Sequence, residues 1–492
     1  MKKIGYILSL GTVLSCTACE EWLTIQPETT MAAELLFQTE TGITQGLNGA
    51  YYKMLSSYRP TSNLGGSGFI EDLANTYYVD PLSGSDSYLY SIHSYDQSDS
   101  QKEVNKQTFM GLYEVIANLN SLLNEMVKNR ESLNSETYKI VRGEAYALRA
   151  CCHLDVLRLY GPVPSVGLGT ATTYVPYVRE NDVNSYAYHT FDEFMDYVQE
   201  DLDSAEMFLQ EVEPVLSTTF EDTESTSNTW PYRKSRCNYY GVLALQARAA
   251  LWRGDNEKAL RYAKMVVEAT NEDGTPRFRL TTPDDDVSDY TVTDRTHYTE
   301  HIFGLKCTDV DAGAYNWPWG YRTNYSCKSM PEYVEALYGE DFLTDLRYSH
   351  FWKSGGGSWV EDPEGNYVYQ YSAFSIARYD DFSSTSTTAN NNFPIIRLPE
   401  MYFIVMECGT LEEANALYEE YCAARNVAYE PLTENDRQER VILESIREYA
   451  AEGQNFYTYK RNNVSLMYGA TVSCSAEQYI MPLPEEETRE IL

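Results

Sequence analysis

The chain has 492 residues, of which 43% are hydrophobic and 23% are charged. This composition is typical of a globular protein that can bury a sizeable core. The formal net charge is −35, from 38 Lys and Arg against 73 Asp and Glu. Such a surface repels phosphate backbones, so nucleic acid is not an expected partner. No run of 18 or more apolar residues occurs, so the sequence predicts no membrane-spanning helix.

The first 18 residues have the pattern of an export signal. Lys2 and Lys3 precede a short apolar stretch, and small residues follow before Cys19. Residues 1–18 are therefore predicted to be a lipoprotein signal peptide, with Cys19 as the lipidated residue and Cys16 as the alternative. Cleavage without lipid attachment is a further alternative. In each case the mature chain leaves the cytoplasm.

Several stretches of the chain have apolar side chains three or four residues apart, which predicts helices. These stretches are 104–128, 137–160, 190–209, 236–270, 400–424 and 438–458. Thr190 and Glu193 form a capping-box pattern at the start of the third. Residues 253–255 break the fourth into a helical hairpin of the tetratricopeptide type. We expect 400–424 and 438–458 to form a second such pair.

Between the predicted helices lie long polar and aromatic spans with little periodicity. They cover about 56–103, 210–235 and 271–395. Loops of this length in a compact protein are usually functional. The expected architecture is mostly α: a scaffold of helical hairpins in a single domain over 19–492, with long irregular loops forming a ligand-binding face.

The order of several motifs resembles the SusD/RagB family of nutrient-binding lipoproteins of Bacteroidota. The motifs, with their residue ranges, are CEEWL (19–23), GLNGAY (46–51), LYEVIAN (112–118), GEAYALRA (143–150), LYGPVP (159–164), DLDSA (201–205), RGD (253–255), EHIF (300–303), IRLPEMY (396–402), REYAAEG (447–453) and MPLP (481–484). They extend over nearly the whole chain. One departure is Ala450-Ala451, where typical members carry a Phe-Glu-like pair, and it leaves the ligand class open.

The resemblance implies a SusD-like helical fold and a non-catalytic function. It also implies a lipid-anchored protein on the cell surface of the outer membrane, attached to that membrane through the lipid only. The implied partner is a SusC-like TonB-dependent transporter, which the protein covers as a lid. The implied ligand is a glycan or oligosaccharide.

An aromatic-rich segment in the last long loop is the main candidate for ligand contact. Tyr and Trp offer a flat apolar face and a polar tip, which suit the faces and edges of sugar rings. Asn and Arg add hydrogen-bond groups for hydroxyls or carboxylates. The candidates in this segment are Tyr315, Asn316, Trp317, Trp319, Tyr321, Arg322 and Tyr325.

The early loop supplies a second set of candidates, because aromatic residues from both loops join in glycan-binding members of the family. This set comprises Asp72, Asn75, Tyr77, Tyr78, Tyr88, Tyr90, Tyr95 and Asp96. The alternative for both sets is that the rings pack the loops against the scaffold or contact the transporter. Trp352 and Trp359 are weaker candidates.

The remaining chemical signals are weak. His297 and His301 have a metal-like spacing, but the predicted strand at Glu300 would separate them, so no metal and no cofactor are expected. The acidic run at 284–289 lacks the Gly and terminal Glu of a calcium-binding EF-hand loop. Cys307 and Cys327 flank the aromatic loop, and their pairing stays open.

No hydrolase, phosphate-binding or dinucleotide-binding motif appears, and no carboxylate pair stands out as catalytic. The expected function is therefore capture of a nutrient, a glycan or oligosaccharide, for the transporter. Capture of peptides or another non-sugar ligand is the first alternative. A secreted helical-barrel glycoside hydrolase or lyase is the alternative from another class of protein.

Overall fold

A computed structural model describes most of the chain. The described residues are 36–60, 62–66, 68–77, 95, 99–166, 172–182, 185–285, 294–307, 328–329, 331–340, 342–354, 357–361, 363, 365–371, 374–379 and 391–489. Their buried apolar side chains form one continuous core between Phe37 and Met481. The predicted boundary between signal peptide and mature domain lies outside the described residues and stays a prediction.

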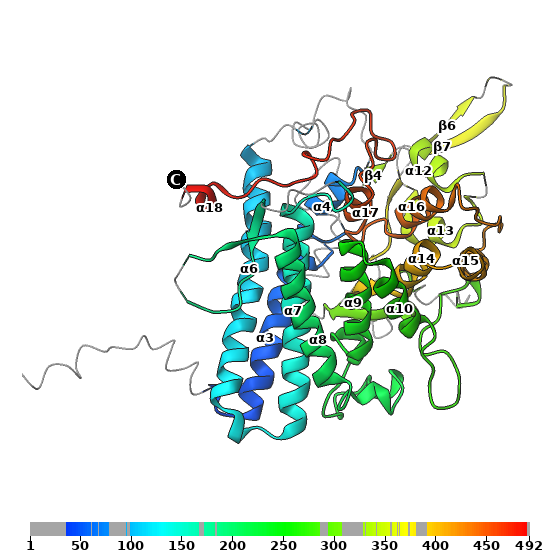
Figure 1. Ribbon diagram of the computed structural model, residues 1–492. Helices are drawn as coiled ribbons and strands as arrows, with labels where there is room; N and C mark the ends of the chain where they lie inside the picture. Colours follow the sequence, from blue (N-terminus) through cyan, green and yellow to red (C-terminus); the bar gives the residue numbers. More distant parts are fainter. Residues whose placement is uncertain are drawn as a thin grey trace, which may run out of the picture.

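The protein is mostly helical, as predicted (Figure 1). The helices are α3 (Glu40–Tyr58), α4 (Phe69–Leu73), α6 (Asp99–Lys128), α7 (Ser135–Tyr160), α8 (Phe191–Leu209), α9 (Tyr239–Arg253), α10 (Asn256–Val267), α12 (Pro331–Tyr338), α13 (Leu346–Phe351), α14 (Leu398–Cys408), α15 (Leu411–Arg425), α16 (Arg437–Glu448), α17 (Asn455–Arg461) and α18 (Glu485–Arg489). None of the helices that the structure describes is long and apolar enough to cross a membrane.

Helices α3, α6, α7 and α8 lie side by side as one half of the molecule (Figure 1). The stripe predicted over 104–128 is the buried face of α6: from Phe109 to Met126 its members are at most 5% exposed. Gly143 lets α7 approach α8 closely, because a Cβ there would lie 2.6 Å from Cγ of Leu209. Helix α7 ends before Gly161-Pro162, as expected from the helix-breaking proline.

The predicted starts and breaks of α8 to α10 are confirmed. Thr190 and Glu193 form a complete capping box at the start of α8. Helices α9 and α10 form a hairpin whose turn is at Gly254, with φ of +85°, a left-handed conformation that glycine adopts without steric cost.

The prediction of one helix pair over 400–458 was wrong, because this region contains α14, α15, α16 and α17. Gly409 continues as extended backbone after α14, and Thr410 then caps α15 through a second capping box with Glu413. Between α16 and α17 the chain turns through Ala451 and Gly453, both with positive φ. The box at Thr410 obeys the same spacing rule as the box at Thr190, so the sequence carried the signal for this break.

Short strands occupy parts of the last predicted loop and of the segment between α7 and α8. They are β1 (Thr173–Pro176), β2 (Tyr188–Thr190), β3 (His301–Lys306), β4 (Lys328–Ser329), β5 (Trp352–Ser354), β6 (Gly357–Glu361), β7 (Tyr367–Tyr371), β8 (Phe374–Ile376) and β9 (Asn392–Arg397). All pairs are antiparallel, in the orders β1-β2, β3-β9, β4-β8-β5 and β6-β7. The predicted strand after Glu300 is β3, which pairs with β9 so that His301 faces Arg397. The β6-β7 hairpin extends away from the body (Figure 1).

Candidate functional site

A fully buried ionic network joins β3 and β9 to α15 and α16. Glu300 accepts hydrogen bonds from Arg397 (2.5 Å) and pairs with Arg425 (2.8 Å) through its two carboxylate oxygens. Glu448 is shared by the same arginines, at 2.8 Å from each. All four side chains are 0% exposed. Because each carboxylate bridges two guanidinium groups, the network fixes the sheet against the helices.

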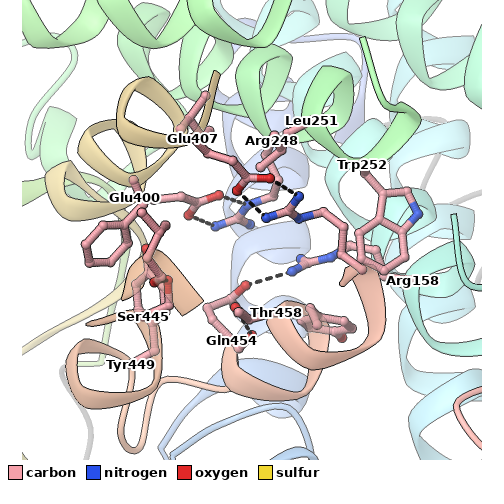
Figure 2. Close-up of a pocket in the computed structure, with 15 residues that line it drawn as sticks. Arg158, Arg248, Leu251, Trp252, Glu400, Glu407, Ser445, Tyr449, Gln454 and Thr458 are labelled. Atoms are coloured by element: carbon pink, nitrogen blue, oxygen red, sulfur yellow. Dashed lines mark hydrogen bonds and ion pairs between the residues drawn. The ribbon is translucent and has the colours of Figure 1, made fainter. Parts of the chain in front are cut away.

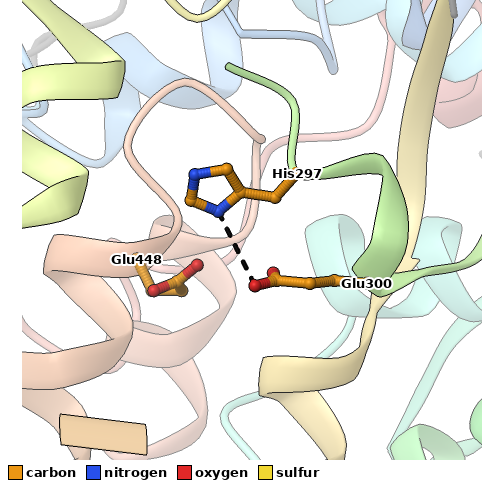
Figure 3. Close-up of side chains that lie close together, drawn as sticks. All are labelled: His297, Glu300 and Glu448. Atoms are coloured by element: carbon orange, nitrogen blue, oxygen red, sulfur yellow. Dashed lines mark ion pairs between the residues drawn. The ribbon is translucent and has the colours of Figure 1, made fainter. Parts of the chain in front are cut away.

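Among the described residues, the possible metal-ligand atoms of His297, Glu300 and Glu448 lie within 4.8 Å of one another (Figure 3). Both glutamates belong to the same ionic network. The His297 Nδ1 atom lies 3.7 Å from Glu300 Oε1. Arg397 and Arg425 already bind the oxygens of both carboxylates, and their positive charges oppose a cation there. This group is therefore structural in character.

The two histidines singled out from the sequence do not converge. His297 Nε2 lies 3.0 Å from His350 Nδ1, whereas His301 Nε2 lies 2.8 Å from the carbonyl oxygen of Thr296. Burial lowers the pKa of His297 to about 3, so its ring is neutral at physiological pH. The expected absence of a metal is not tested by these contacts.

The acidic run and the cysteine pair are described only in part. Asp285 accepts two hydrogen bonds from Arg279, at 2.6 and 2.7 Å, which hold the pKa of its carboxyl below its usual value. Residues 286 and 289 lie outside the described residues. Cys307 is buried at the end of β3, and Cys327 lies outside the described residues, so their pairing stays open.

A small polar cavity lies between α9, α14, α16 and α17 (Figure 2). Arg248 binds Glu400 with two hydrogen bonds of 2.7 and 2.6 Å, and Arg461 binds Glu407 with two of 2.6 Å. Arg158 lies with its guanidinium carbon 3.5 Å from the centre of the Tyr457 ring. The volume is about 60 Å³, which is room for a few water molecules and too little for a sugar ring. The cavity is not a glycan site.

A larger groove of about 790 Å³ opens between α6, the β1-β2 hairpin and α18. Tyr113 of α6 and Tyr186 and Tyr188 of the hairpin line it. Tyr188 donates a hydrogen bond of 3.3 Å to Glu487 of α18, and burial together with this carboxylate raises the pKa of Tyr188 to about 12. A volume of this size falls in the range of small-molecule sites.

The principal candidates from the sequence lie outside the described residues. These are Tyr315, Asn316, Trp317, Trp319, Tyr321, Arg322 and Tyr325 of the late loop, Tyr78, Tyr88, Tyr90 and Asp96 of the early loop, and Cys19 and Cys16. Their proposed roles stay predictions.

The structure places Asp72, Asn75, Tyr77 and Tyr95 of the early loop. The first three are 2%, 4% and 2% exposed. Asn75 has a left-handed backbone (φ 55°) and donates a hydrogen bond of 2.9 Å to the carbonyl oxygen of Tyr468. Tyr77 donates to the carbonyl oxygen of Gly66. These contacts pack the loop against the scaffold, and a ligand-binding role for these side chains stays a prediction.

Tyr95 and the two weaker tryptophan candidates differ in their exposure. Tyr95 is half-buried against the core. Trp352 is 4% exposed and donates a hydrogen bond of 3.1 Å to Tyr338 Oη. Trp359 is 66% exposed on the projecting β6-β7 hairpin, which makes it the one of these three that a ligand reaches without rearrangement.

The groove residues were not predicted from the sequence. Tyr113 and Glu114 belong to the motif at 112–118, inside a predicted scaffold helix. Tyr186 and Tyr188 lie in the segment after the helix that ends at Gly161-Pro162, and this segment has no periodic pattern. Glu487 comes from the far end of the chain. No local spacing rule links three such distant segments.

The N-terminal part of the chain matches a family model, and the whole fold matches solved structures. The model is the SusD-like one described as "Starch-binding associating with outer membrane", and it matches residues 21–223. The fold is similar to that of a SusD superfamily protein from Bacteroides thetaiotaomicron, with a TM-score of 0.67 and 18% identity over 92% of this chain and 98% of that one. The fold is SusD-like, and residues 21–223 are similar to the SusD-like family.

Two further relatives support the assignment. A SusD-like protein of Formosa agariphila is 28% identical over 172 residues, which is 33% of this chain and 31% of that protein. The match thus spans about a third of the curated relative. A structure named as a SusD-like carbohydrate binding protein, from Bacteroides vulgatus, has a TM-score of 0.61 and 15% identity over 92% of this chain and 96% of that one. The SusD-like fold predicted from the motifs is confirmed.

Proposed function

We propose that this SusD-like protein binds a glycan or oligosaccharide at the cell surface and passes it to a SusC-like TonB-dependent transporter. The observation that carries the proposal is the combination of the family match with the SusD fold over 92% of the chain. The family description names starch binding and association with the outer membrane. The aromatic residues of the late loop, above all Trp317 and Trp319, supply the chemistry for sugar rings.

The proposal includes a lipid anchor on Cys19 and a role without catalysis. Metabolic labelling with a radioactive fatty acid tests the anchor. Label lost in Cys19→Ser and kept in Cys16→Ser supports it, and the reverse pattern moves the anchor to Cys16. Prolonged incubation with the bound glycan tests the second point: an unchanged glycan is expected, and released fragments would make the protein a hydrolase or lyase.

Partnership with the transporter is tested by affinity purification from the native membrane. The expected result is one co-purifying protein with the mass of a TonB-dependent barrel, retained at high salt. Recovery of the tagged protein without such a barrel would contradict the partnership. Glycan binding by the isolated protein is a separate measurement and does not depend on this one.

Capture of peptides is the second candidate, because Ala450-Ala451 departs from the family pattern. In the structure this dipeptide is buried, and the Ala450 carbonyl oxygen accepts a hydrogen bond of 3.1 Å from Arg378 while that of Ala451 accepts one of 2.9 Å from Tyr379. The departure therefore falls in the scaffold. The departure thus gives no evidence for a peptide ligand, and titration with both ligand classes distinguishes them.

A further inference from the structure

The groove between α6, the β1-β2 hairpin and α18 has an unusual charge. Its acidic lining residues are Glu114, Glu180, Asp182 and Glu487. Every charged side chain among the described residues that line it is acidic. Glu180 and Asp182 are exposed at the mouth of the groove. Such a lining attracts a cation and repels an anionic ligand.

Of three nearby basic side chains, Lys53 pairs with a groove carboxylate, and Lys106 and Arg179 pair with acidic residues that do not line the groove. Lys53 pairs with Glu114 at 2.9 Å, but both side chains are about half exposed, so water screens this pair. Lys106 pairs with Glu486, which precedes Glu487 in α18. Arg179, next to Glu180, turns toward Glu200 at 2.7 Å. These pairs leave the groove with a net negative charge.

The tyrosines of the groove are held in place by hydrogen bonds. Tyr113 donates one of 2.8 Å to the carbonyl oxygen of Pro176, which ties α6 to β1. Tyr186 donates a hydrogen bond of 2.7 Å to Asp182 Oδ1, and its hydroxyl also lies 3.1 Å from the carbonyl oxygen of Glu180. The rings are therefore pre-organised for a ligand, which reduces the entropy lost when one binds.

We propose that this groove binds an amino-sugar oligosaccharide whose amines are protonated. The tyrosine rings match the apolar faces of the sugars, and the exposed amide and hydroxyl of Asn181 and Ser185 match their hydroxyl groups. The carboxylates of Glu180 and Asp182 receive the ammonium groups. None of the late-loop aromatics is among the residues that define this site, and the sugar class of its ligand rests on the proposed function.

A basic peptide is the competing occupant. The lining combines three ring faces with neutral amide and hydroxyl groups around the carboxylates. A lysine side chain brings an ammonium group and an apolar stem, which match the carboxylates and the rings. An amino sugar brings hydroxyl groups as well, which also match Asn181 and Ser185. The mixture of groups therefore favours the amino sugar.

Calorimetric titration of the mature protein, carrying Cys19→Ser so that no lipid is attached, tests this inference. The probes are a glucosamine tetramer and its N-acetylated counterpart, at low ionic strength and mildly acidic pH. We expect the charged tetramer to bind about tenfold more tightly or better, and its affinity to fall as salt is added. The double variant Glu180→Gln/Asp182→Asn should weaken it by about tenfold.

The matched control is Glu257→Gln/Glu268→Gln, which removes the same charge from two exposed positions, one in α10 and one at its C-terminal end, neither of which lines the groove. The control should leave the affinity unchanged. Equal affinity for both tetramers would overturn the inference, and so would equal weakening by the control. A trilysine peptide that binds as tightly as the tetramer would assign the groove to a basic segment and overturn the amino-sugar ligand.

The late-loop variant Trp317→Ala/Trp319→Ala separates this inference from the proposed function. Tetramer binding that persists in this variant supports the groove, and loss of binding would place the ligand in the late loop and overturn the inference. If neutral glycans do not bind but the tetramer binds through Glu180 and Asp182, the result contradicts the proposed late-loop site and supports the groove.

Discussion

Glu71 provides a pH-dependent test of the packing around the early loop. Its carboxyl is fully buried in α4, where it accepts a hydrogen bond from the Gly453 backbone N–H. Burial raises the pKa of Glu71 from 4.5 to about 8, against the opposing effect of its hydrogen bonds. The folded protein therefore holds a proton on this group that the unfolded chain releases between these two values.

The sign follows from proton linkage. Between pH 4.5 and about 8 the folded state binds one proton more at Glu71 than the unfolded state, so the free energy of unfolding falls as the pH rises through this window. The loss is about 1.4 kcal/mol for each pH unit, or on the order of 5 kcal/mol across the window. Below pH 4.5 the group contributes no pH dependence.

The test is urea unfolding of the wild type and Glu71→Gln at a series of pH values from below 4.5 to above 8. Glutamine is neutral at every pH and keeps an oxygen for the Gly453 N–H. We expect the two proteins to differ little at acidic pH, and the variant to be more stable at alkaline pH by a few kcal/mol. Glu257→Gln, at an exposed position of α10, is the control and should follow the wild type. A constant difference between wild type and Glu71→Gln across the series would refute the reasoning.

Three further substitutions test the scaffold, each by urea unfolding. Arg397→Met should cost about 3–5 kcal/mol, because it removes one of the two guanidinium groups that the buried Glu300 and Glu448 carboxylates share. A loss below about 1 kcal/mol would mean that Arg397 does not stabilise the network. Thr190→Ala should cost about 1 kcal/mol through loss of the α8 cap, and no loss would mean that the capping box does not form in solution. Gly143→Ala should cost about 1–3 kcal/mol, because the new methyl meets Leu209. Gly49→Ala, where nothing lies within 4 Å of the added Cβ, should be neutral or stabilising, and equal effects at the two glycines would contradict the close packing of α7 on α8.

The parts of the fold that the sequence predicted correctly depend on local rules. The stripe of α6 and the cap at Thr190 follow from spacings of three and four residues, which are visible in one helix alone. The break at Gly409 obeys such a rule too and was still missed, because apolar residues continue on both sides of it. The ionic network around Arg397 joins residues about 50 to 100 positions apart, which no local pattern reveals.

The candidate site was harder to predict, because burial depends on tertiary packing. Asn75 and Tyr77 lie in a polar, aromatic segment that is typical of exposed loops, yet the structure buries both. The turn at Gly453 approaches the same region from the other end of the chain and covers it. Conversely, nothing in the sequence distinguishes Tyr186 and Glu180 from ordinary linker residues. They line a groove because α6 lies beside the β1-β2 hairpin.

The central claim is glycan capture through the aromatic late loop, and titration of intrinsic tryptophan fluorescence tests it most directly. The mature protein with Cys19→Ser is titrated with a panel of neutral polysaccharides, oligosaccharides and peptides, beside Trp317→Ala/Trp319→Ala and the control Tyr52→Ala, at an exposed position of α3. The account predicts saturable binding of one neutral glycan class, lost in the late-loop variant and kept in the control. Saturation by peptides alone, or glycan binding that survives the loss of Trp317 and Trp319, would contradict it.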